Sequence, residues 1–144
     1  MPSPSGADET DEFIELFNSN DFEIDLSGWK IENLGTNPNS TITIPSGTIV
    51  ADGYFLIANY PAVDSAINSS ITVDFNATTI QLLNSGEILT LKDASGNTID
   101  ETPAGNWAAG DNTSAARKSM ERNMIPGDGT LAGRWHTCIA EGCS

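Results

Sequence analysis

Acid–base or nucleophilic catalysis needs a base beside a nucleophile, or a carboxyl group whose pKa is shifted. The sequence has one histidine, His136, which stands next to Trp135 near the end of the printed chain. It contains no G-x-S-x-G motif, no H-E-x-x-H motif and no glycine-rich phosphate loop that opens a helix. A histidine without such partners is typical of a packed or solvated side chain. The sequence therefore predicts a protein that is not an enzyme.

Four acidic side chains near the start are better candidates for chemistry. Asp8, Glu9, Asp11 and Glu12 crowd one segment, and calcium takes several oxygen ligands from carboxylates and carbonyls of this kind. Their spacing matches no EF-hand loop, and in a strand Glu12 would point away from Asp11. Calcium bound by these four residues is one hypothesis, and a solvated acidic loop is the alternative. No other cofactor is predicted.

Both cysteines, Cys138 and Cys143, lie in the last seven residues, with four residues between them. This spacing permits a small disulfide-closed loop if the backbone turns there. Two thiols with only His136 nearby would make an incomplete tetrahedral metal site. We therefore predict a disulfide, with free thiols as the alternative, and a disulfide indicates an oxidising compartment.

Two charged residues, Glu15 and Arg122, stand among apolar neighbours at predicted strand positions. One hypothesis is that Glu15 pairs across a sheet with Arg122 or with Lys30. The alternative is that these side chains simply point outward. A salt bridge here would be structural and would say nothing about activity.

Composition limits the possible partners. The 144 residues are enough for one domain with a substantial core, and the 20 acidic against 6 basic residues give a formal net charge of −14. Such a charge repels phosphate backbones, which excludes nucleic acid as an expected partner. No apolar run is long enough to cross a membrane, so membrane insertion is not expected. The first residues, Met1–Gly6, lack the basic and apolar regions of a signal peptide, and we interpret the chain as cut from a longer one.

The stretch that organises the fold runs from Asp11 to Asn33. Ile14 and Leu16 alternate with Glu15 as in a half-buried strand, and polar residues 18–21 then form a turn. After a second turn, Trp29 and Ile31 share one face of the next strand. Further strands are predicted over residues 41–44, 54–58, 71–75, 80–83, 87–92, 98–101 and 119–123, with 87–92 and 98–101 forming the clearest hairpin. Residues 59–70 are expected to be a loop with one helical turn, and 103–114 a Gly/Asn/Ala-rich loop around Trp107.

Four blocks of this sequence carry a family resemblance. In chain order they are E-F-I-E-L-F-N with D-L-S-G-W-K-I at 12–31, I-P-S-G-T-I with D-G-Y-F-L-I at 44–57, N-S-G-E-I-L-T-L with Asp93, Gly96 and I-D at 84–100, and S-M-E-R with Trp135. Together they resemble the lamin tail domain, and the last block is similar to the close of its prokaryotic version. The resemblance covers about residues 11–135.

The resemblance implies an all-β, immunoglobulin-like β-sandwich. We expect a flexible lead-in at residues 1–10, the sandwich at 11–137 and a cysteine-bearing tail at 138–144. The predicted core includes Ile14, Leu16, Trp29, Ile31, Ile57, Leu89 and Leu91.

The family context also implies a function. In secreted and surface proteins of prokaryotes, such domains accompany extracellular enzymes or surface proteins. This favours a monomeric, non-catalytic attachment module, extracellular or at the cell surface, that binds a protein or another cell-surface partner. The alternatives are a calcium- or carbohydrate-binding accessory domain of an extracellular enzyme, and a nuclear-lamin tail with protein or chromatin contacts, against which the charge argues. A fold alone does not decide between them.

One departure from the family concerns the first strand. The family's first strand precedes a segment similar to Met1–Pro4, and the printed sequence begins at that segment. We therefore expect a missing strand beside the strand at Glu12–Asn18. The edge left by it is predicted to be blunted by acidic residues, or else to pair with another strand.

Overall fold

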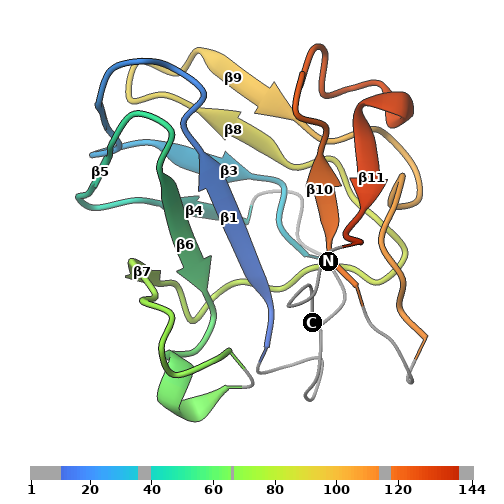
Figure 1. Ribbon diagram of the computed structural model, residues 1–144, viewed down its shortest axis with the longest axis horizontal. Coiled ribbons are helices and arrows are strands. Elements are labelled where there is room, and N and C mark those ends of the chain that lie inside the picture. The colour runs from blue at the N-terminus through green and yellow to red at the C-terminus, as the bar shows by residue number, and fades with distance from the viewer. Residues whose placement is uncertain (1–10, 36–39, 66, 114–117, 140–144) are drawn as a thin grey trace.

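The computed structural model describes residues 11–35, 40–65, 67–113 and 118–139 (Figure 1). Within these ranges the chain is built of short strands and two single-turn 3-10 helices, joined by turns and loops. In chain order they are β1 Phe13–Phe17, β2 Ile24–Asp25, β3 Lys30–Glu32, β4 Thr41–Thr43, β5 Thr48–Ile49, β6 Tyr54–Ala58, η1 Ala62–Asp64, β7 Phe75–Asn76, β8 Thr90–Lys92, β9 Thr98–Glu101, β10 Met120–Arg122, η2 Ala132–Arg134 and β11 Trp135–Thr137.

The first sheet has the order β1-β6-β7. Strands β1 and β6 are antiparallel and pair from Phe13 with Ala58 to Phe17 with Tyr54, whereas β7 joins β6 in parallel. The predicted alternation of β1 is visible in its side chains. Ile14 and Leu16 pack against the core, while Glu15 is exposed.

The second sheet has the order β4-β3-β8-β9, and all its neighbouring strands are antiparallel. Figure 1 shows β3 and β4 of this sheet passing behind β1 and β6, with β8 and β9 above them, so the two sheets form the layers of a sandwich. The hairpin between β8 and β9 is the one that the sequence predicts. Its turn is closed by Asn97, whose side chain and backbone N–H both donate to Asp93 and lower the pKa of that carboxyl group.

The core lies between the two sheets and is almost entirely aliphatic. Its buried members come from both sheets and from the loops that join them. They are Leu26, Ile31, Leu34, Ile42, Ile44, Ile49, Phe55, Ile57, Ala77, Ile80 and Leu82. All seven predicted core residues belong to this cluster or pack against it. Ile31 and Ile57 are buried, and Ile14, Leu16, Trp29, Leu89 and Leu91 are partly buried and pack against it. The fold is thus the predicted all-β, immunoglobulin-like sandwich.

The two edges of β1 differ. The Asn18 N–H donates to the Gly53 carbonyl, and the Asn59 N–H donates to the Glu12 carbonyl. Since backbone direction alternates along a strand, the N–H and C=O groups of the even-numbered residues of β1 face β6, and those of Glu15 face the other edge. In the described part of the chain no strand pairs with that other edge. That a family strand is missing there stays a prediction.

Several elements differ from the sequence prediction. Of the strands expected at 71–75 and 80–83, the structure has only β7, which begins at Phe75. Segment 80–83 forms no strand because its amides bond elsewhere: the Ile80 N–H closes a turn on Ala77, and the Leu82 N–H donates to the Glu12 carboxylate at 2.9 Å. Strand β11 was not predicted, and it pairs with β10 as an antiparallel hairpin separate from both main sheets.

Candidate functional site

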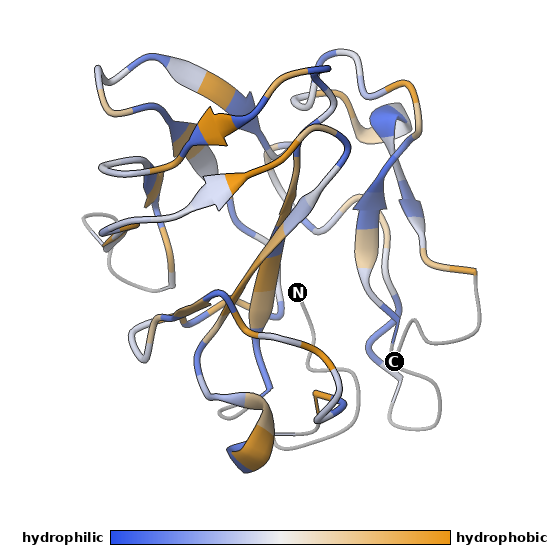
Figure 2. Cartoon of the chain, turned by 60° about the vertical axis from the view of Figure 1, so that its left-hand side comes forward, coloured by the Kyte–Doolittle hydropathy of each residue, from blue (hydrophilic) through white to orange (hydrophobic). Residues whose placement is uncertain are grey.

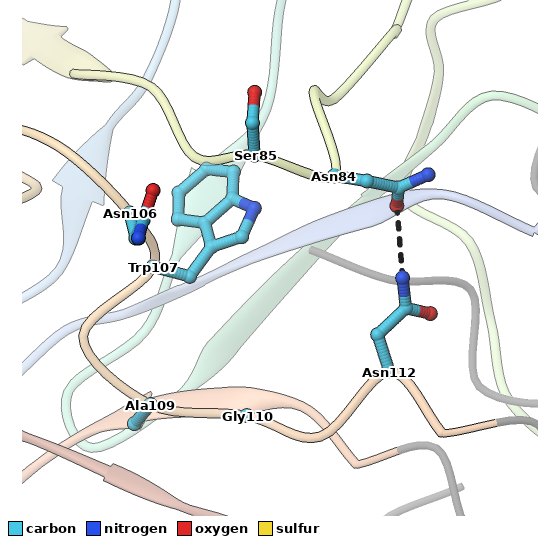
Figure 3. Close-up of a pocket in the computed structure, with 7 residues that line it drawn as sticks. All are labelled: Asn84, Ser85, Asn106, Trp107, Ala109, Gly110 and Asn112. Carbon is cyan, nitrogen blue, oxygen red and sulfur yellow. Dashed lines mark hydrogen bonds between the residues drawn. The ribbon is translucent and has the colours of Figure 1, made fainter.

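A pocket of about 370 Å³ lies between the turn after Leu83 and the loop that contains Trp107 (Figure 3). Figure 3 shows the Trp107 indole on one side of the hollow and the amides of Asn84 and Asn112 on the other. The lining residues are Asn84, Ser85, Asn106, Trp107, Ala109, Gly110 and Asn112. The volume is at the lower end of the range for small-molecule sites.

The Trp107 indole is held in place from below. Its Nε1–H donates to the Leu83 carbonyl at 2.7 Å, and the ring packs against the edge of the hydrophobic core. The same carbonyl accepts the Gly86 N–H, which closes the turn. The turn is tied further by Glu87, whose carboxylate accepts the Leu83 N–H at 3.2 Å and the Gly35 N–H at 2.7 Å. Burial raises the pKa of Glu87, and these two amide bonds partly offset the rise.

Backbone contact joins the two walls of the pocket. Gly86 has φ +92°, and a Cβ added there would lie 2.6 Å from the backbone nitrogen of Trp107. Only glycine allows so close an approach in this conformation. On the far wall, the Gly110 N–H donates to the Thr137 hydroxyl at 2.9 Å, which fastens the loop to β11. The pocket is therefore a built feature of the fold.

A second hollow, of about 480 Å³, borders the first at Asn84. Its lining is mostly hydroxyl, amide and aliphatic, and consists of Glu12 and residues 78–84. The two hollows are linked by the Asn84 side chain, whose Oδ1 accepts a long hydrogen bond of 3.4 Å from Asn112 Nδ2. The carboxylate of Glu12 is engaged with the Leu82 N–H.

The side chains that line the first pocket can form hydrogen bonds and apolar contacts but carry no charge. None of its seven lining residues carries an acidic, basic or imidazole side chain. The hydroxyl of Ser85 has no general base among these residues, so the lining lacks the machinery of acid–base or nucleophilic catalysis. Amides, a hydroxyl and an indole face make directional hydrogen bonds and apolar contact instead.

The family model described as Lamin Tail Domain matches residues 1–105, nearly three quarters of the chain. The chain belongs to the lamin tail domain family. This family consists of non-catalytic, immunoglobulin-like modules. No curated protein matches the sequence significantly. Of the residues that line the first pocket, Asn84 and Ser85 lie within the range matched by the family model, whereas Trp107 and Asn112 lie beyond it.

The proposed calcium ligands of this lamin tail domain are only partly described. Asp8 and Glu9 lie outside the described residues. Asp11 is 2% exposed and Glu12 is 7% exposed, and Glu12 serves the Leu82 amide, so both are buried parts of the sandwich instead of members of a solvated loop. In the described ranges no group of three or more acidic, histidine or cysteine side chains is placed to hold a metal ion. Calcium at the four residues stays a prediction.

The predicted ion pairs of Glu15 are wrong. Arg122 pairs instead with Asp100, at 3.0 Å between Nε and Oδ2. Glu15 has acidic neighbours: burial, then Glu121, then Asp74 raise its pKa.

The alternative pairing with Lys30 fails because that residue lies in the other sheet. There it stands opposite Thr43 and Lys92 across the strands.

Arg122 instead organises the C-terminal hairpin. Besides Asp100, its guanidinium donates to the carbonyls of Pro126 at 2.8 Å and Gly127 at 2.9 Å, and it stacks on the Trp135 ring at 4.8 Å from the ring centre. The Trp135 indole in turn donates to the Gly129 carbonyl at 2.8 Å. The N–H groups of the guanidinium thus donate to Asp100 of β9 and to carbonyls of the segment between β10 and β11.

Two further residues that the sequence singled out, Cys138 and His136, lie at the same end of the molecule. Cys138 is buried and disulfide-bonded, and its backbone N–H donates to the Ser119 carbonyl. Its predicted partner, Cys143, lies outside the described residues, so the pairing stays a prediction. The His136 Nδ1 is 3.0 Å from the Asn123 Oδ1, and its Nε2 is 3.5 Å from Glu121.

The pocket itself was not predicted as a site. The only signal in the sequence was a tryptophan inside the Gly/Asn/Ala-rich loop at 103–114. Two further lining residues, Asn84 and Ser85, come from a turn some twenty residues earlier. Contacts far apart in the sequence bring the two segments together: the close approach of Gly86 to the Trp107 backbone, and the bond from the Trp107 indole to the Leu83 carbonyl.

Within the described residues no helix is long and apolar enough to span a membrane.

Proposed function

We propose that this lamin tail domain is a non-catalytic interaction module that attaches a secreted or cell-surface prokaryotic protein to its surroundings. The observation that carries this proposal is the Trp107 pocket, whose lining can bind a ligand but holds no acid, base or activated nucleophile. Family membership supports the same conclusion.

The extracellular part of the proposal is supported by Cys138. A buried cysteine in a disulfide is typical of oxidising compartments and rare in the cytosol. The net charge of −14 favours solubility and disfavours contact with nucleic acid. It therefore counts against the reading as a nuclear-lamin tail that contacts chromatin.

The proposal is tested by retention on cells. The full chain, labelled with a fluorophore at an added terminal tag, is incubated with intact cells of its source organism and with cells shaved by protease. We expect saturable retention on intact cells that unlabelled protein competes away. Labelling no stronger than that by an unrelated protein of similar charge would contradict attachment.

A matched titration tests the chromatin alternative. We expect no binding of the chain to duplex DNA at about 150 mM salt, because neutralising phosphates needs clustered basic side chains and the sequence has 6 in all. Salt-sensitive affinity in the micromolar range would favour the nuclear reading over attachment.

A further inference from the structure

We propose that the Trp107 pocket binds a neutral oligosaccharide, with one sugar ring on the indole and the next over the hollow at residues 78–84. This inference rests on the proposed function and names the class of ligand that the module attaches to.

The absence of charge from the lining is the first argument. The chain carries 20 acidic residues, yet the seven residues of the pocket include none, and no basic residue either. A cationic ligand would find no carboxylate among these residues, and an anionic one would find no guanidinium or ammonium group and would face the negative field of the chain. The lining therefore favours a ligand that is polar and neutral.

The mixture of surfaces is the second argument. A pyranose ring has hydroxyl groups around its rim and apolar C–H faces, so it fits a site that combines amides with one aromatic face. The Trp107 ring supplies the apolar face, and Asn84, Asn106 and Asn112 supply amide donors and acceptors around it (Figure 3). A purely apolar ligand would cover these amides without offering them a hydrogen bond in place of water.

Preorganisation is the third argument. The Trp107 indole is fixed by its bond to the Leu83 carbonyl and by packing against the core, so little side-chain freedom is lost when a ligand stacks on it. The contact of Gly86 with the Trp107 backbone and the bond of Gly110 to Thr137 hold both walls. A shallow site gains most from being rigid before it binds.

The second hollow sets the length of the ligand. It shares Asn84 with the first and is lined by Thr78, Thr79 and Gln81 on its polar side. Its single carboxylate, that of Glu12, accepts the Leu82 N–H. A chain of two or more sugar residues would span both hollows across Asn84, whereas a single sugar would fill only the first.

The test is a titration of the full ¹⁵N-labelled chain, followed by NMR. The probes are four neutral tetrasaccharides, with β-1,4-glucose, β-1,4-N-acetylglucosamine, β-1,4-mannose and α-1,4-glucose backbones, and one charged control, tetragalacturonate. We expect at least one neutral tetrasaccharide to bind with a dissociation constant below about 1 mM. It should shift the side-chain signals of Asn84, Asn112 and the Trp107 indole.

Variants locate the ligand. Asn112 is exposed, so Asn112→Ala should leave the fold intact and weaken binding about 2- to 10-fold, as expected for one lost hydrogen bond. Trp107→Phe keeps an aromatic face but loses the bond to Leu83, and should weaken binding further. The matched controls, Asn68→Ala and Phe22→Ala, change an exposed amide and an exposed aromatic ring outside both hollows, and should bind as the unmodified chain does.

Three results would overturn the inference: no tetrasaccharide binding below about 10 mM, binding that is unchanged in both Asn112→Ala and Trp107→Phe, or tetragalacturonate binding as tightly as the neutral sugars. Its failure is distinguishable from failure of the attachment proposal. Retention on cells without sugar binding would leave attachment standing and remove the carbohydrate site. Sugar binding without retention on cells would do the reverse.

Discussion

The sandwich core and the C-terminal hairpin are held together by different kinds of contact. In the core, aliphatic side chains such as Ile44 and Ile57 are 0% exposed and belong to a cluster with members from both sheets. In the hairpin formed by β10 and β11, every strand residue except Met120 is only half-buried. Figure 2 shows the same contrast, with hydrophobic colours along the strands of the sandwich and mostly hydrophilic ones on the hairpin near the C-terminus.

The hairpin compensates with directional contacts. Arg122 alone bridges Asp100 of β9, two carbonyls of the connecting segment and the Trp135 ring. Apolar burial is non-directional and cooperative, whereas a few polar contacts fix geometry locally. We infer that the sandwich determines the global stability and that the hairpin can open without unfolding it. The family match, which ends at residue 105, covers the first region and not the second.

The largest expected effect is in the core. Ile57→Ala should lower the free energy of unfolding by about 2–5 kcal/mol, because it removes buried methyl groups and leaves a cavity between the sheets. Ile99→Ala, at a 50% exposed position of β9, should cost under about 1 kcal/mol. Urea denaturation of both variants measures the difference. Equal midpoints would show that the core does not dominate stability.

A smaller and more local effect is expected in the hairpin. Arg122→Met should destabilise by about 1–3 kcal/mol, because it removes the guanidinium that donates to the Asp100 carboxylate and to two carbonyls. A double-mutant cycle with Asp100→Asn should give a coupling energy of about 0.5–3 kcal/mol. Hydrogen exchange should speed up at β10 and β11 and stay unchanged at β6. Uniform acceleration across both regions would contradict independent opening.

Much of the sandwich could be predicted because its residues follow local rules. The period-two alternation of β1 identified Ile14 and Leu16 as inward-facing, and the D-A-S-G-N turn identified the hairpin of β8 and β9. Segment 80–83 was wrongly predicted as a strand because its apolar residues satisfied the same rule. Its Leu82 amide bonds to a carboxylate 70 positions earlier, and no local pattern records that contact.

The candidate site was less predictable for the same reason. Glu15 and Arg122 were paired on sequence character alone, yet Arg122 pairs with Asp100, and Glu121 is among the causes that raise the pKa of Glu15. The pocket depends on Gly86 and Trp107, which meet only when two separate loops fold together. Residue types indicated that a glycine turn and a tryptophan loop exist, but their contact is a tertiary property.

The disulfide offers a way to sharpen the contrast between the two regions. Unreduced protein is predicted to contain no thiol that alkylates, because Cys138 is disulfide-bonded and the sequence has only one other cysteine. Cys138→Ala should cost about 1–2 kcal/mol, since a short loop restricts the unfolded chain little. The loss of stability should be confined to the hairpin, because the backbone N–H of Cys138 donates a hydrogen bond to the carbonyl of Ser119, next to β10. Mass spectrometry after alkylation checks the pairing, and two modified thiols would contradict it.

The smallest expected effect concerns Glu15, which lies in β1 of the sandwich and whose pKa responds to Glu121 of the hairpin. Its pKa is raised from the ordinary 4.5 by burial and then by Glu121 and Asp74. A raised pKa in the folded state means that folding favours the protonated form. The associated stability is fully present below pH 4.5 and is lost as the pH rises through the folded pKa.

Glu15→Gln should therefore match the unmodified chain at about pH 4 and be more stable at about pH 7. We expect the gain to stay under about 1 kcal/mol, because the side chain is partly exposed and solvent screens its neighbours. Glu23→Gln, which removes the same charge outside this acidic group, separates the local effect from the change in net charge. If the repulsion reaches across from the hairpin, Glu121→Gln should reproduce part of the gain, and combining it with Glu15→Gln should yield less than the sum. Additive gains would show that sandwich and hairpin do not interact at this position.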